Sequence, residues 1–241
     1  MPLRTKALLN QACRAQGGGQ HLAALPRLLA MAASIGLLAA STMAMSGGLS
    51  PQLAAVRDRW AEINYKTPKQ EREAAFGALA KQAAALHAAQ AKNAAGLIWE
   101  GIVLSSFADE RGGLGALGPA KQARADFEQA IKLDPAALDG SAYTGLGVLY
   151  YSVPGWPIGF GNDETARELL RKGLRLNPDG LDANYFYGDF LQHQRDWKGA
   201  AAAVEKALAA PARQGRELAD QGRRREAAAL LAKVRRHLAA R

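Results

Sequence analysis

Cysteine is almost absent from this sequence, which has a single residue of this type, Cys13, among its 241 residues. Cys13 comes before the long apolar run of the N-terminal part, so it cannot be the lipid-bearing cysteine of a lipoprotein, which follows such a run. The rest of the sequence therefore offers no disulfide, no thiol nucleophile and no thiolate metal ligand.

Acidic residues are absent from the first 57 positions, and the first one is Asp58. Only bases precede the uncharged run Leu28 to Met45, and no second run of this kind follows. An export signal typically has basic residues, then an apolar run, and then small residues such as Ala44 and Ser46. Residues 1–46 are therefore interpreted as a signal peptide or, if they are not cleaved, an N-terminal anchor. We expect a periplasmic protein, either free or attached to the inner membrane.

Aromatic residues are scarce, at 7% of a chain that is 49% hydrophobic and rich in alanine. Small side chains bury little apolar area each, so a core built from them requires closely packed helices. Without the predicted export signal, the basic character belongs to the C-terminal end, where the segment 212–241 has nine bases and three acids.

Patterns that carry chemistry are also missing. The histidines of the repeat region and tail, His87, His193 and His237, lie far apart and have no metal-ligand spacing. The glycines of residues 152–163 do not follow the order of a phosphate-binding loop. We therefore expect a protein with no catalytic residue, no metal and no cofactor.

An internal repeat is what the chain does contain. The segments DFEQAIKLDP (126–135) and LLRKGLRLNP (169–178) end alike, and their similarity continues at a constant offset of 43, as from Gly145 to Gly188. A third such segment ends at Pro211. Small residues at these spacings let two helices approach closely, and proline ends the second helix, which is the tetratricopeptide pattern. The sequence predicts an all-α solenoid of antiparallel helix pairs.

The repeat divides the chain into regions. We expect a helical pair in 47–92, repeats in 93–211 and a basic capping helix in 212–241. The first two repeats have nine or ten extra residues between their helices, which predicts long connections at 109–119 and 152–163, side by side on one edge. We expect Asn162 or Asp163 to cap the next helix, and the capping helix to bury Ala227, Leu230, Leu231, Val234 and Leu238.

The stretches GLGALG, LDGSAYTGLGVLYY, VPGWPIGFGND and NPDGLDANYFYGDFL resemble exported tetratricopeptide-repeat proteins of Gram-negative bacteria. The resemblance covers roughly residues 51–236. More loosely, the chain is similar to the TatT-type components associated with some TRAP solute transporters. The resemblance implies a helical-repeat fold in the periplasm and no enzymatic residue.

The candidate partner-binding residues are aromatic. Trp156 and Phe160 alternate with proline and glycine, together with Ile158. These side chains form either a rigid apolar lip above the concave surface or a plug that seals the gap between repeats. Four tyrosines are expected on the first helices of repeats, which line the concave groove, with some of them in the core: Tyr150, Tyr151, Tyr185 and Tyr187.

The sequence leaves the partner open. We expect a non-enzymatic scaffold that binds a protein or peptide in a concave groove. The alternative is a transporter accessory that binds a small apolar solute between the two connections. The C-terminal arginines, Arg223 to Arg225 with Arg235 and Arg236, either contact anionic lipid or form a solvated outer face, and no nucleic-acid partner is expected.

Overall fold

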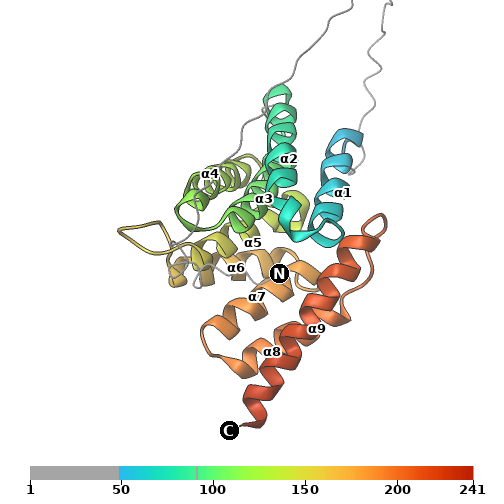
Figure 1. Ribbon diagram of the computed structural model, residues 1–241. Helices are drawn as coiled ribbons and strands as arrows, with labels where there is room; N and C mark the ends of the chain where they lie inside the picture. Colours follow the sequence, from blue (N-terminus) through green and yellow to red (C-terminus); the bar gives the residue numbers. More distant parts are fainter. Residues whose placement is uncertain (1–48, 91, 241) are drawn as a thin grey trace, which may run out of the picture.

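A computed structural model describes residues 49–90 and 92–240 of the chain. This part contains nine α-helices and no strand (Figure 1). The predicted export signal, residues 1–46, lies outside the described residues. No helix in the described part is both long enough and apolar enough to cross a membrane.

The helices form successive pairs that stack into an all-α helical repeat of the tetratricopeptide type, as the sequence predicts. The pairs are followed by a single long helix, α9. The helices have these bounds: α1 Pro51–Tyr65 and α2 Lys69–Ala89, α3 Ala94–Arg111 and α4 Leu117–Leu133, α5 Ala137–Ser152 and α6 Asp163–Leu176, α7 Leu181–His193 and α8 Trp197–Ala209, and α9 Glu217–Ala239.

Local signals in the sequence set the helix ends. The side chain of Asn162 accepts a hydrogen bond from the backbone N–H of Thr165, so the expected cap of α6 is confirmed. A proline stands two residues beyond the last residue of α4, α6 and α8 alike. Proline lacks a backbone N–H and cannot continue a helix, so it fixes these three ends at equivalent places.

Glycines allow the pairs to pack closely around one large side chain. Phe127 of α4 is fully buried between α3 and α5. A Cβ atom on Gly101 of α3 would lie 2.8 Å from the Phe127 ring, and one on Gly145 of α5 would lie 2.5 Å from it. Both distances are shorter than any real carbon–carbon contact, so the two glycines leave the space that the ring occupies.

The connection at 109–119 is shorter than the sequence predicts. Helix α3 continues to Arg111, a 3₁₀ turn η2 occupies Gly113–Ala116, and α4 begins at Leu117. No proline interrupts the end of α3, and Pro119 falls in the first turn of α4, where its missing N–H costs nothing. The extra residues therefore lengthen the two helices. Of the two connections predicted to be long, only the one between α5 and α6, residues 153–162, is long and non-helical.

Helix α9 closes the stack. It packs on α7 and α8 with its C-terminal part, and its N-terminal part also contacts α1 (Figure 1). The first helices of the four pairs and α9 therefore contact one another in a closed ring, α1–α3–α5–α7–α9. The expected apolar face of α9 is confirmed, with Ala227, Leu230, Leu231 and Val234 buried and Leu238 partly buried.

Candidate functional site

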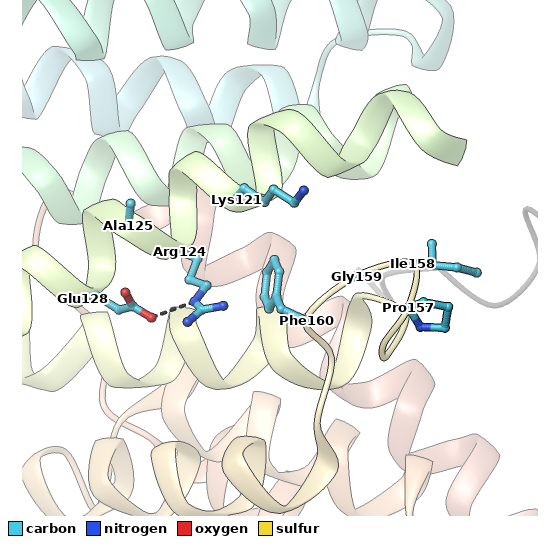
Figure 2. A pocket seen from close by; sticks show the side chains of 8 residues that line it. All are labelled: Lys121, Arg124, Ala125, Glu128, Pro157, Ile158, Gly159 and Phe160. Atoms are coloured by element: carbon cyan, nitrogen blue, oxygen red, sulfur yellow. Dashed lines mark hydrogen bonds and ion pairs between the residues drawn. The ribbon is translucent and has the colours of Figure 1, made fainter.

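The candidate site is a groove of about 340 Å³ between α4 and the connection 153–162 (Figure 2). One wall is a single face of α4, since its lining residues are spaced by three or four positions. The other wall is the connection. The groove is lined by Lys121, Arg124, Ala125 and Glu128 of α4 and by Pro157, Ile158, Gly159 and Phe160.

Backbone hydrogen bonds give the connection its shape. The N–H of Gly161 donates to the carbonyl of Pro154 at 2.9 Å, and the N–H of Asn162 donates to the carbonyl of Tyr150 at 2.8 Å. The chain crosses itself so closely here that a Cβ atom on Gly161 would overlap the carbonyl of Val153. Glycine is therefore required at this position, and the connection has a defined fold of its own.

Phe160 fastens the connection to the solenoid. Its ring meets the ring of Tyr150 edge to face, with the centroids 5.4 Å apart. The guanidinium of Arg124 lies over both rings, and its Nε donates to Glu128 Oε1 at 2.7 Å. That hydrogen bond, the largest cause, raises the pKa of Arg124. The sealing interpretation is therefore the one that applies to Phe160.

Trp156 behaves in the opposite way. Its side chain is 89% exposed, and Ile158 is 47% exposed at the open end of the groove (Figure 2). Leu114, in the η2 turn that leads into α4, is 78% exposed. The tip of the connection therefore presents apolar surface, while Phe160 at its base packs against the solenoid.

The tyrosines expected in a concave groove do not share one surface. Tyr185 is buried, with the guanidinium of Arg223 4.6 Å from its ring centroid. The hydroxyl of Tyr151 donates to Asp189 at 2.9 Å, and burial raises the pKa of Tyr151 well above its usual value. Tyr187 accepts a hydrogen bond from Arg171, and Tyr150 packs under the connection.

Helix α9 is the reason that no open concave groove exists beside α7. Gly222 of α9 approaches the ring of Tyr65 of α1 so closely that a Cβ atom would overlap it. The guanidinium of Arg216 lies 5.6 Å from the ring of Trp99 of α3. The surface on which the sequence placed a partner is thus packed against the protein's own last helix.

An ionic cluster holds α9 in this position. Asp182 of α7 accepts hydrogen bonds from Arg223 and Arg213, at 2.8 and 2.7 Å, and Arg213 also pairs with Asp220. Burial raises the pKa of Asp182, but the guanidinium groups of Arg223 and Arg213 outweigh it and hold the pKa well below its usual range. Opposite charges thus meet at the junction of α7 and α9.

Neither alternative given for the C-terminal arginines, a lipid contact or a solvated outer face, describes Arg223 and Arg224. Arg223 is buried in the ionic cluster, and Arg224 donates to the carbonyl groups of Leu208 and Ala210. Both guanidinium groups bind acceptors within the protein, so they are not available to a membrane surface. The exposed arginines of the trio and tail are Arg225, Arg235 and Arg236, and Arg235 pairs with Glu205.

A second hollow, of about 290 Å³, lies between α1 and the start of α9. Two of its charged residues have partners, whereas the buried Nε of Arg216 has no hydrogen-bond partner in the part of the chain that the structure describes. Arg57 pairs with Asp58 at 2.7 Å, and Glu217 accepts a hydrogen bond from the N–H of Gly215 at 3.0 Å. The groove beside α4 is the better candidate because apolar side chains stand exposed at its open end.

Sequence reasoning missed the α4 wall of the groove and a pair of buried acids. Lys121, Arg124 and Glu128 could have been found by asking which face of α4 lies beside the enlarged connection. Glu100 of α3 and Asp126 of α4 are buried; burial, then the charge of Glu100, raises the pKa of Asp126 to about 7. Within the described residues, no group of three His, Cys, Asp or Glu side chains is placed to hold a metal ion.

The chain is similar to several solved structures. No family model matches the chain, and no curated protein matches it. Among solved structures, MamA 41-end from Desulfovibrio magneticus RS-1 is similar, with 15% sequence identity and a TM-score of 0.36. The match covers 80% of this chain and 99% of that chain.

Proposed function

We propose that this chain is a non-enzymatic helical-repeat scaffold that binds a protein or peptide partner at the edge formed by α4 and the connection 153–162. The observation that carries the proposal is the 89% exposure of Trp156 on a connection whose backbone and base are fixed. A large aromatic side chain held out from a rigid support loses little conformational freedom on binding, and such residues dominate the energy of interfaces.

The edge also offers the right kind of surface. Trp156, Ile158 and Leu114 are exposed apolar side chains on the two connections between the helices of neighbouring pairs. Exposed apolar side chains that lie together mark a site of interaction, and Trp156 and Ile158 are two residues apart on one short connection. The concave side, where repeat proteins of this type are expected to bind, is covered by α9 beside α1 and α7, and this favours the edge as the binding surface.

Site-specific photo-crosslinking tests the proposal. p-Benzoylphenylalanine is introduced at Trp156 and, as a matched control, at Ala228, which is exposed on α9. In the producing cell, the residue at position 156 should give a discrete cross-linked protein that position 228 does not give. An equal pattern at both positions, or no adduct at 156, would overturn the proposed site.

The alternative, a transport accessory that binds an apolar solute, is favoured by one observation. The groove volume of about 340 Å³ falls in the lower part of the range for small-molecule sites. A thermal-shift screen with small organic acids and apolar solutes separates the two functions. A concentration-dependent rise in Tm that Ile158→Ser removes would favour the solute, because a ligand that binds the folded state stabilises it.

We also propose that the protein is exported. The proposal rests on the basic start and the uncharged run Leu28 to Met45. Cell fractionation with N-terminal sequencing of the mature protein tests it. A periplasmic chain that starts near residue 45 or 47 supports a cleaved signal. An intact chain bound to the membrane supports an anchor. An intact chain in the cytoplasm contradicts export.

A further inference from the structure

The charges that line the groove do not balance. Arg124 and Glu128 pair with each other at 2.7 Å (Figure 2). Lys121, one turn into α4, has no hydrogen bond or ion pair to any of the described residues, and its side chain is exposed. The groove therefore has one uncompensated positive charge at its wall, placed where a bound segment would pass.

Apolar groups lie directly beside this charge. Ala125 follows Lys121 by one helical turn, the ring of Phe160 faces α4 from the connection, and Ile158 lies at the open end of the groove (Figure 2). Ile158 is only half covered by the protein's own atoms. An apolar side chain of a partner would bury this surface. The partner's backbone, or the residue next to that side chain, would then lie beside Lys121.

Charge excludes the chain's own N-terminal segment as the occupant. The first 57 residues contain bases but no Asp or Glu, whether they belong to the same copy or to a second one. Such a segment would bring positive charge to Lys121 and Arg124. The partner that fits the groove must instead carry negative charge.

We infer that the groove takes a peptide segment of a partner protein in which an apolar side chain stands next to a carboxylate. The apolar side chain packs on Phe160 and Ile158, and the carboxylate pairs with the ammonium group of Lys121. The inference rests on the proposed function and names its partner's chemistry. Because Lys121 is exposed, this pairing weakens as the salt concentration rises.

Selection from a random decapeptide display library tests the inference on the whole chain. Enriched peptides should combine Asp or Glu with Leu, Ile, Phe or Trp within two positions. Synthetic copies of these peptides should bind Lys121→Glu about tenfold more weakly than the unchanged protein, because the change replaces an attractive charge pair by a repulsive one. Lys81→Glu, an equally exposed change on α2, should leave binding unchanged.

The outcomes separate this inference from the proposed function. Neutral or basic peptides that bind and lose affinity with Ile158→Ser would overturn the acidic partner and leave the scaffold standing. A library with no peptide sensitive to Ile158→Ser would overturn both. Binding to phosphatidylglycerol vesicles, lost in Trp156→Ala while no peptide is enriched, would show that the edge serves a lipid surface and would also overturn the inference.

Discussion

The guanidinium group of Arg124 lies over the ring of Phe160, with its central carbon 5.1 Å from the ring centroid. Arg124 belongs to α4, and Phe160 belongs to the connection that precedes α6. This contact joins the helix α4 of one pair to the non-helical connection of the next pair. It explains why Phe160 is half-buried while Trp156, four residues earlier, is exposed.

Arg124→Ala should loosen the connection. The change removes the stacked guanidinium from the rings of Phe160 and Tyr150, so amide hydrogens of residues 153–161 should exchange faster. The free energy of unfolding should fall by about 1 kcal/mol. Trp156→Ala, which removes no internal contact of comparable size, is the control and should change neither quantity. Exchange that is as slow in Arg124→Ala as in the unchanged protein would contradict the anchoring role.

Asp182→Ala should weaken the attachment of α9. After the change, the buried Arg223 keeps its ion pair with Glu226 but loses the one with residue 182 of α7. Arg213 also loses its ion pair with α7. Loss of hydrogen bonds to charged groups predicts a destabilisation of about 2 to 3 kcal/mol. Urea unfolding measures it, with Glu205→Ala, which removes an exposed pair with Arg235, as the control. Equal small effects of the two changes would show that the cluster does not hold α9.

Stability should fall as the pH rises from about 5 to about 7, because Asp126 has a raised pKa. The folded state keeps a proton on Asp126 that the unfolded state has released, so this contribution is complete at low pH and is lost through a pKa of about 7. The slope approaches about 1.4 kcal/mol per pH unit for one proton.

Asp126→Asn is the matched variant, since it retains the oxygen that accepts from Gln122. Glu100 of α3 and His87 of α2 are the other titratable groups that act on this carboxyl. The Asn variant should have a flatter profile of urea midpoint against pH and should be the more stable protein at pH 7.5. An unchanged slope would assign the pH dependence to other groups.

Two glycines of neighbouring helices should respond in opposite ways to alanine. Gly145→Ala places a methyl group against the Phe127 ring and should destabilise the protein by about 1 to 3 kcal/mol through overpacking. Gly118→Ala, near the start of α4 with open space around it, should stabilise by about 0.4 to 1 kcal/mol because it restricts the unfolded chain. Thermal unfolding of both variants measures the contrast. A stabilising Gly145→Ala would disprove the close approach of α4 and α5.

The sequence predicted the helix pairs because small residues and prolines recur at fixed offsets. Gly145, Gly188 and Pro211 stand at repeat positions whose physical role is local, so the pattern alone identified them. The repeat pattern did not predict the length of the 109–119 connection. Extra residues lengthen helices or form a loop depending on where the prolines fall, and here Pro119 lies inside α4.

The position of α9 was also beyond the sequence pattern. Its apolar face was predicted, but its contact with α1 depends on the accumulated rotation of all the preceding pairs, which no single repeat specifies. The burial of Arg223 follows from that contact, since its partner Asp182 lies 41 residues away in the chain. An arginine in a basic run is solvated by default, and only the tertiary structure shows otherwise.

Hydroxyl-radical footprinting of the protein bound to its tightest display peptide is the most direct test of binding at the edge. The predicted result is that oxidation of Trp156 and Ile158 falls severalfold, while Trp197 and His237, which stack on each other at the far end, are oxidised at an unchanged rate. Unchanged oxidation of Trp156, with protection of side chains on α7 and α9 instead, would contradict it and would return the binding site to the concave side.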